Sequence, residues 1–151
     1  MIQAQNLVKQ YSNGVVALSG INLEIDKGEF VFLVGASGAG KTTFMNLIIR
    51  RELPTSGSLL VGRKNVSKIK PSEVPYFRRN IGVIFQDFKL LPNKTVFENV
   101  AFALETIEAS RREILRQVPA VLELVGLREK ANVFPSELSG GEQQRVSLAR
   151  S

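Results

Sequence analysis

A glycine-rich segment at residues 35–42 constrains the fold of this chain most, because strongly patterned stretches lie on both sides of it. Residues 30–34 are apolar at every position, which predicts a strand buried on both faces of a parallel sheet. Residues 42–50 are rich in apolar side chains and predict a helix with a broad buried face. A strand, a loop and a helix in this order form half of a βαβ unit, so an α/β fold is predicted.

The residue types of this segment predict phosphate binding. It matches the pattern G-x-x-x-x-G-K-S/T with Gly35, Ala36, Ser37, Gly38, Ala39, Gly40, Lys41 and Thr42. Glycines let backbone N–H groups turn towards phosphate oxygens, and the helix that follows directs its positive end at the same anion. Lys41 can reach the β- and γ-phosphates of a nucleotide, and the Thr42 hydroxyl can bind Mg²⁺. ATP and Mg²⁺ are therefore the expected cofactors, with the adjoining Thr43 in the same site.

The rest of the first half predicts mainly strands. Short strands are expected at residues 2–7, 15–18 and 21–25, with the alternation of a small antiparallel sheet that has one wet face, and a separate short strand is expected at residues 59–61. Residues 71–79 predict a short helix with a proline in its first turn, and residues 81–85 predict a second buried strand.

Residues 87–138 have a helical pattern and predict a helical insertion. Val96, Val100 and Leu104 fall on one face of a helix over residues 95–104. Ser110 begins a capping box for a second helix, which Gly126 ends and Pro119 is expected to kink.

Composition excludes several classes of site and partner. The sequence has no cysteine and no histidine, so disulfides, thiolate metal sites and histidine-based catalysis are excluded. The net charge of +6 could favour nucleic acid or an anionic membrane, but the basic residues are scattered and we expect no nucleic-acid partner. Neither a signal peptide nor a membrane-spanning run is present, so we expect a cytoplasmic chain that reaches a membrane through a partner.

A second motif lies at residues 138–145. Ser139 and Glu142 form a capping box at the start of a helix, and Gly140 and Gly141 leave backbone N–H groups open. Such a helix end can bind an anion, although a capped helix alone would also explain the segment.

Together the two motifs resemble those of the ABC ATPase family, and the resemblance covers residues 2–150. It implies a P-loop NTPase fold of the ABC nucleotide-binding type, with a small antiparallel β subdomain and a helical insertion. The implied parts are an ATP-binding core at residues 1–86, a helical subdomain at 87–138 and a signature helix at 139–151. Tyr11 is similar to the aromatic residue that stacks on adenine, and Gln86 to the Q-loop glutamine that touches Mg²⁺.

The resemblance also implies a head-to-tail homodimer of the full-length protein. Ser139, Gly140 and Gly141 would then face the γ-phosphate held by the other subunit. The family usually has glutamine where Glu142 stands, which leaves the contact of this side chain open.

Within the family, residues 74–79 and 85–96 are most similar to ATP-binding subunits of bacterial cell division, which act with an integral membrane partner. The resemblance places the contact with that partner near Phe88, Leu90 and Leu91, on the inner face of the plasma membrane. Packing inside the helical part would also explain these three side chains. ATPases of methionine importers and of lipoprotein or macrolide exporters share much of the pattern and remain alternatives.

The later motifs of the family are not in the sequence. A Walker B strand with its glutamate and a switch histidine would follow the signature helix, so we expect a fragment with no catalytic residue, unable to hydrolyse ATP alone. Its unpaired sheet predicts marginal stability and aggregation. A non-hydrolysing nucleotide-binding module is the alternative from another class. A P-loop kinase or GTPase would leave residues 138–145 unexplained.

Overall fold

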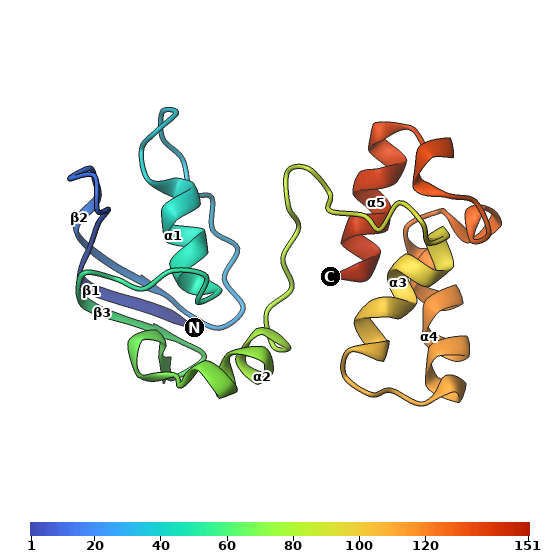
Figure 1. Ribbon diagram of the computed structural model, residues 1–151, viewed down its shortest axis with the longest axis horizontal. Helices are drawn as coiled ribbons and strands as arrows, with labels where there is room; N and C mark the ends of the chain where they lie inside the picture. Colours follow the sequence, from blue (N-terminus) through green and yellow to red (C-terminus); the bar gives the residue numbers. More distant parts are fainter. The chain divides into compact units, whose positions relative to one another are not determined.

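The computed structural model describes residues 1–151, which form two compact units, Met1–Asn80 and Ile81–Ser151 (Figure 1). The first contains all the strands and the second contains three of the longer helices. The expected division at residues 86/87 and 138/139 stays a prediction.

The first unit is built on a four-stranded antiparallel sheet in the order β2-β1-β3-β4. Its strands are β1 (Ile2–Gln10), β2 (Val16–Ile25), β3 (Ser56–Val61) and β4 (Lys64–Asn65). The predicted small antiparallel sheet is therefore confirmed. The expectation of two strands at residues 15–18 and 21–25 was wrong, because β2 runs through both and absorbs the irregular spacing in shifts of its register with β1.

Two helices complete this unit. The helix α1 (Lys41–Ile48) buries Phe44, Leu47 and Ile48 as its amphipathic pattern predicts. After a 3-10 turn at Pro71–Glu73 comes α2 (Val74–Arg78), where a single longer helix was expected. The Arg78 guanidinium donates hydrogen bonds to the carbonyls of Ile49 and Arg50, which ties α2 to the end of α1.

The second unit packs α3 (Val96–Glu105), α4 (Arg111–Leu124) and α5 (Gly140–Arg150) around one apolar core. The helical faces predicted from residues 95–104 and from the segment after Ser110 are confirmed, since both contribute to this core. Its buried members are Val96, Val100, Ala101, Val118, Leu122, Leu127, Leu138 and Val146.

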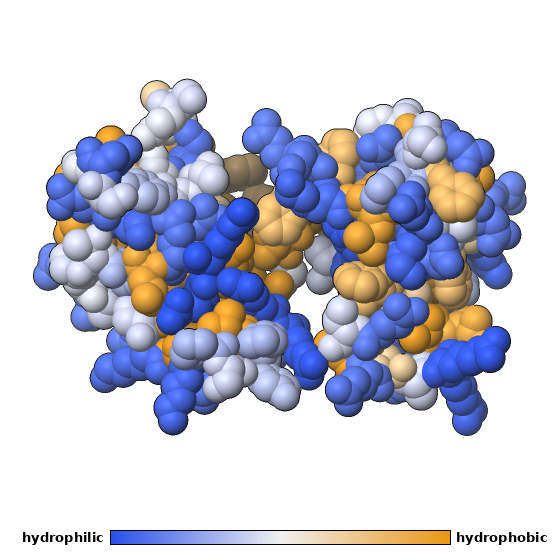
Figure 2. Space-filling view, in the orientation of Figure 1, coloured by the Kyte–Doolittle hydropathy of each residue, from blue (hydrophilic) through white to orange (hydrophobic).

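The strands predicted at residues 30–34 and 81–85 are not formed. A strand needs a neighbour for its backbone hydrogen bonds, and no segment of the chain pairs with either run. The side chains of Phe30, Phe32 and Val34 are 84%, 78% and 83% exposed. The expected exposure of apolar side chains is therefore present, and hydrophobic side chains reach the surface of both units (Figure 2). None of the helices is long and apolar enough to span a membrane.

Candidate nucleotide-binding site

The glycine-rich loop turns tightly before α1. The Ala39 N–H donates to the Ala36 carbonyl at 3.2 Å, and Gly38 and Gly40 have φ angles of 80° and 85°. At Gly40 a Cβ atom would lie 2.4 Å from the Ala17 carbonyl oxygen, so a side chain would collide with the backbone of β2. Both the conformation and the space therefore require glycine at residue 40.

The N-terminus of α1 is open to an anion. No side chain caps it, and its first turn contains no acidic residue. The first amides of a helix have no intrahelical partner, so those of Lys41, Thr42 and Thr43 can donate to phosphate oxygens, and the helix dipole favours a negative charge there. The residues present fit a polyphosphate.

Lys41 lies over this loop. Its ammonium group donates hydrogen bonds of 2.6 Å to the carbonyls of both Gly35 and Ala36. The cation is thus held among the backbone groups that would surround a phosphate chain. Thr42 is exposed, which suits a hydroxyl that binds Mg²⁺, whereas Thr43 is buried.

Tyr11 is half-buried just beyond β1. Its hydroxyl lies 3.1 Å from Thr43 Oγ1 and donates to Glu52 Oε1 at 3.1 Å. The structure therefore connects the expected adenine-stacking residue to the first turn of α1 in the same unit.

Gln86, in the second unit, is exposed and begins a tight turn. The next residues include Phe88 and Lys89, which adopt left-handed conformations with φ of 54° and 49°. Arg150 at the end of α5 donates to the carbonyls of both, at 2.8 Å and 2.7 Å, and Ser147 donates to that of Phe88 at 3.2 Å. The helix of the second motif thus holds the turn that carries Gln86.

The second motif forms the predicted capping box. The Glu142 Oε2 atom accepts hydrogen bonds from the backbone N–H and the hydroxyl of Ser139, both at 2.8 Å. The other carboxylate oxygen accepts from the Lys130 ammonium at 2.5 Å. The hydrogen bond from Lys130 and those from Ser139 lower the pKa of Glu142 to about 2. Gly140 and Gly141 are exposed, and their amides have no intrahelical partner.

Residues 18–151 match the ABC transporter family, a span that includes both motifs. The chain belongs to the ABC transporter family. The fold expected from the resemblance is therefore confirmed.

Curated ABC relatives include subunits of two kinds. Over the whole chain it is 57% identical to the cell division ATP-binding protein FtsE of Bacillus subtilis, of which it spans 66%. It is 56% identical to FtsE of Mycobacterium tuberculosis over 99% of its length, again spanning 66% of that protein. It is 48% identical to the methionine import ATP-binding protein MetN of Helicobacter pylori over its whole length, spanning 46% of that protein. The chain thus spans no more than 66% of any of these relatives.

Solved ABC cassettes have the same architecture. A dimeric post-hydrolysis state of the ATP-binding cassette MJ0796, bound to ADP and Pi, is 36% identical with a TM-score of 0.88. The match covers 99% of this chain and 68% of that one. The cassette cbiO1 from Clostridium perfringens is 28% identical with a TM-score of 0.88, covering 99% of this chain and 59% of that one.

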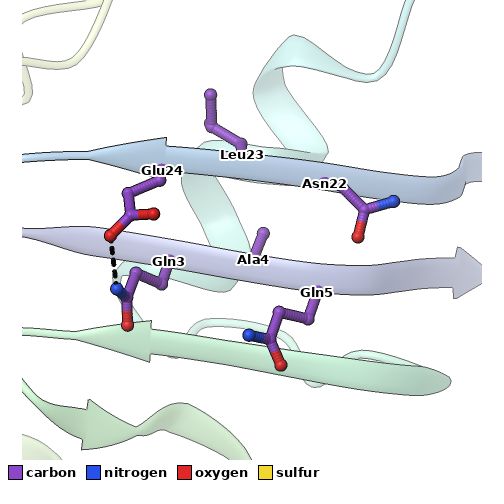
Figure 3. Close-up of a pocket in the computed structure, with 6 residues that line it drawn as sticks. All are labelled: Gln3, Ala4, Gln5, Asn22, Leu23 and Glu24. Atoms are coloured by element: carbon purple, nitrogen blue, oxygen red, sulfur yellow. Dashed lines mark hydrogen bonds between the residues drawn. The ribbon is translucent and has the colours of Figure 1, made fainter.

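A hollow of about 330 Å³ lies on the sheet, away from the ABC motifs in the sequence (Figure 3). Two of the residues that line it, Gln3 and Glu24, are joined by a hydrogen bond of 2.6 Å. It is lined by Gln3, Ala4, Gln5, Asn22, Leu23 and Glu24. None of these residues was a candidate for the nucleotide site.

Sequence reasoning missed two residues that contact the ABC motifs. Lys130 pairs with Glu142 from 12 positions earlier, and Glu52 binds the Tyr11 hydroxyl from 41 positions away. A carboxylate where the family has glutamine was a signal that a cation would lie nearby. No local pattern indicated Glu52.

Proposed function

We propose that the chain is the nucleotide-binding part of an ATP-driven ABC ATPase. The observation that carries the proposal is the open N-terminus of α1, with Lys41 held over the glycine-rich loop. In this proposal Gly35, Ala36, Ser37, Gly38, Ala39 and Gly40 surround the β-phosphate with backbone amides, and Thr42 and Thr43 extend the cradle. Lys41 neutralises the terminal phosphates, and Tyr11 supports adenine.

Mg²⁺ would bind through the Thr42 hydroxyl and Gln86, together with phosphate oxygens. The cation would supply positive charge for the terminal phosphates. Ser139 and the amides of Gly140 and Gly141 would reach the γ-phosphate held by a second copy, in a head-to-tail dimer. Glu142 is engaged by Lys130, so its negative charge is balanced before a phosphate approaches.

We further propose that the whole protein acts in bacterial cell division with an FtsX-like membrane partner, at the inner face of the plasma membrane. The identities of 57% and 56% to FtsE proteins support this, against 48% to the methionine import subunit. Phe88, Leu90 and Leu91 are the proposed contact with the partner. All three are half-buried, and Leu90 packs against the helical core, so Phe88 and Leu91 would supply most of the contact.

Calorimetric titration with Mg²⁺ and ATP tests nucleotide binding. Lys41→Met should weaken ATP binding by about tenfold or more, because the terminal phosphates lose a charge-assisted partner. Lys27→Met, in the exposed turn after β2, is the matched control and should bind like the native protein. Equal affinity of Lys41→Met and native protein would refute the site. Binding without phosphate release, in an assay of the whole protein, would favour the non-hydrolysing module.

Depletion of the protein in its source cells tests the cellular role. We expect elongated cells, and co-purification of the protein with an FtsX-like membrane protein. Normal division together with a loss of methionine uptake would favour the importer alternative.

A further inference from the structure

A cluster of polar side chains joins the end of β1 to α1 and the residues after it. Its members are Lys9, Tyr11, Thr43, Asn46 and Glu52, of which Lys9, Asn46 and Glu52 have no role in the proposed nucleotide site. Glu52 is the centre of the cluster. Its Oε1 atom accepts hydrogen bonds from Tyr11 Oη at 3.1 Å and from Asn46 Nδ2 at 3.3 Å.

Lys9 completes the cluster from β1. Its ammonium group lies 3.3 Å from Glu52 Oε2, donates to the Leu53 carbonyl at 2.9 Å, and stands 5.1 Å from the centre of the Tyr11 ring. The side chains of Lys9 and Glu52 are only 15% and 23% exposed. Glu52 Oε2 accepts no hydrogen bond, so the ion pair with Lys9 balances its charge.

These contacts fix both the place and the tilt of the Tyr11 ring. The hydroxyl is bound at the far end of the side chain by Glu52 and lies next to Thr43, and Lys9 stands over the ring. A phenol side chain restrained in this way loses little further freedom when a flat ligand stacks on it, so stacking costs less conformational entropy. Because Thr43 belongs to the first turn of α1, the Tyr11 ring is held in a fixed position relative to the residues that would bind the phosphates.

We propose that Lys9 and Glu52 are positioning residues for base recognition. They hold the Tyr11 ring at a set distance from the glycine-rich loop, with Lys9 over one face of the ring and the other face turned to the base of the nucleotide. This inference rests on the proposed nucleotide site and assigns the base-dependent part of its affinity to residues outside its motifs. Removal of either residue therefore weakens binding of ligands that have a base and spares ligands that have only phosphates.

The test compares ATP with inorganic tripolyphosphate, which has no base, as ligands of the purified protein with Mg²⁺. Glu52→Gln keeps the size of the side chain and removes its charge, and Lys9→Met keeps most of the aliphatic stem. Each should lower the ratio of ATP affinity to tripolyphosphate affinity by about tenfold, since Glu52→Gln replaces the charged acceptor of the Tyr11 hydroxyl by a neutral one and Lys9→Met removes the ion pair with Glu52. Glu24→Gln, an exposed carboxylate of β2 bonded to Gln3, is the matched control and should leave the ratio unchanged.

An equal loss for both ligands would overturn the proposal, because the cluster would then only support the loop. Unchanged affinity for both ligands would overturn it as well. Tyr11→Phe keeps the ring without the hydroxyl and should lower the same ratio, so it tests the proposal independently should the Glu52 variant fail to fold. Failure of the native protein to bind either ligand would refute the proposed nucleotide site instead.

Discussion

At the scale of single residues, Gly38 and Gly40 have nearly the same backbone conformation but different surroundings. Their φ angles are 80° and 85°, yet a Cβ atom would meet nothing within 4 Å at Gly38 and the Ala17 carbonyl oxygen at 2.4 Å at Gly40. An alanine at residue 38 is therefore destabilising only through its left-handed conformation. An alanine at residue 40 must also move the backbone of β2 or the loop.

These two glycines make a matched pair for a stability measurement. Gly38→Ala should lower the free energy of unfolding by about 1 to 2 kcal/mol, the usual cost of a left-handed alanine. Gly40→Ala should lower it by at least about 1 kcal/mol more, because the loop and β2 must separate. Urea unfolding followed by circular dichroism checks both values. Equal losses would show that β2 yields to the added methyl group at no cost.

The pair of Glu142 and Lys130 makes a prediction for acid stability. The pKa of Glu142 is about 2 in the folded protein against an ordinary value of 4.5. The unfolded chain therefore binds a proton at this carboxylate more readily than the folded protein does. The contribution of the Glu142 carboxylate to the free energy of unfolding is complete above pH 4.5 and is lost as the pH falls towards 2. Glu142→Gln should therefore lose less stability than the native protein when urea unfolding at pH 6 is compared with pH 3.

Lys130→Met separates the two causes of this shift. It removes the hydrogen bond that lowers the pKa most and keeps those from Ser139. Carboxyl carbon chemical shifts, followed by NMR during titration, should show the pKa of Glu142 between its native and ordinary values. A pKa unchanged in this variant would contradict the assigned cause.

At the scale of helices, α1 differs from α3, α4 and α5 in how its N-terminus is satisfied. Each of the latter begins with a capping box, formed by Thr95 with Glu98, Ser110 with Glu113, and Ser139 with Glu142. In each box a carboxylate of the same helix lies at the positive end, and at α5 this carboxylate is itself paired with Lys130. The helix α1 begins at a glycine without such a carboxylate, so its end is the one of these four best suited to a polyphosphate.

The end of α5 supports a strained turn. Arg150 and Ser147 donate to the carbonyls of Phe88 and Lys89, which have positive φ. Burial of the Arg150 guanidinium lowers its pKa, but the group stays charged in the usual pH range. The two Nη atoms of the planar guanidinium each donate to one carbonyl in a fixed fork, whereas the ammonium group of a lysine is a single centre without that geometry.

Loss of this fork should loosen the turn that carries Gln86. Arg150→Lys should lower the free energy of unfolding by about 1 kcal/mol, and Arg150→Ala by about 2 kcal/mol. Both should speed amide hydrogen exchange at residues 88–91, measured by mass spectrometry. Arg112→Ala, on the exposed side of α4, is the control. Unchanged exchange in Arg150→Ala would mean that the turn is held by other contacts.

Elements whose causes are local could be predicted from the sequence. The capping boxes at Ser110 and Ser139 and the helix after the glycine-rich loop depend on residues within one turn, and all three are confirmed. The strands expected at residues 30–34 and 81–85 are not formed, because a strand depends on a partner elsewhere in the chain, and the local pattern does not show whether that partner is present. The same holds for Lys130 and Glu52, whose partners are distant in the sequence and leave no periodic trace.

At the scale of the whole molecule, we expect the exposed apolar run at residues 30–34 to promote association between copies of the chain. Phe30 and Phe32 contact each other edge to face, with ring centres 5.0 Å apart, and neither is covered by another part of the first unit. Two adjacent aromatic rings next to unpaired backbone favour association between copies.

The replacement of Phe30 and Phe32 together by serine should reduce this association. Sedimentation velocity over a range of protein concentrations should show fewer oligomers than for the native chain. The free energy of unfolding should change by less than about 0.5 kcal/mol, as expected of exposed positions. Leu124→Ser removes an apolar side chain that is 86% exposed on α4, and it should leave association nearly unchanged because no second large apolar side chain of comparable exposure adjoins it. A large loss of stability in the double variant would instead mean that the two rings are buried in solution, as in a paired strand.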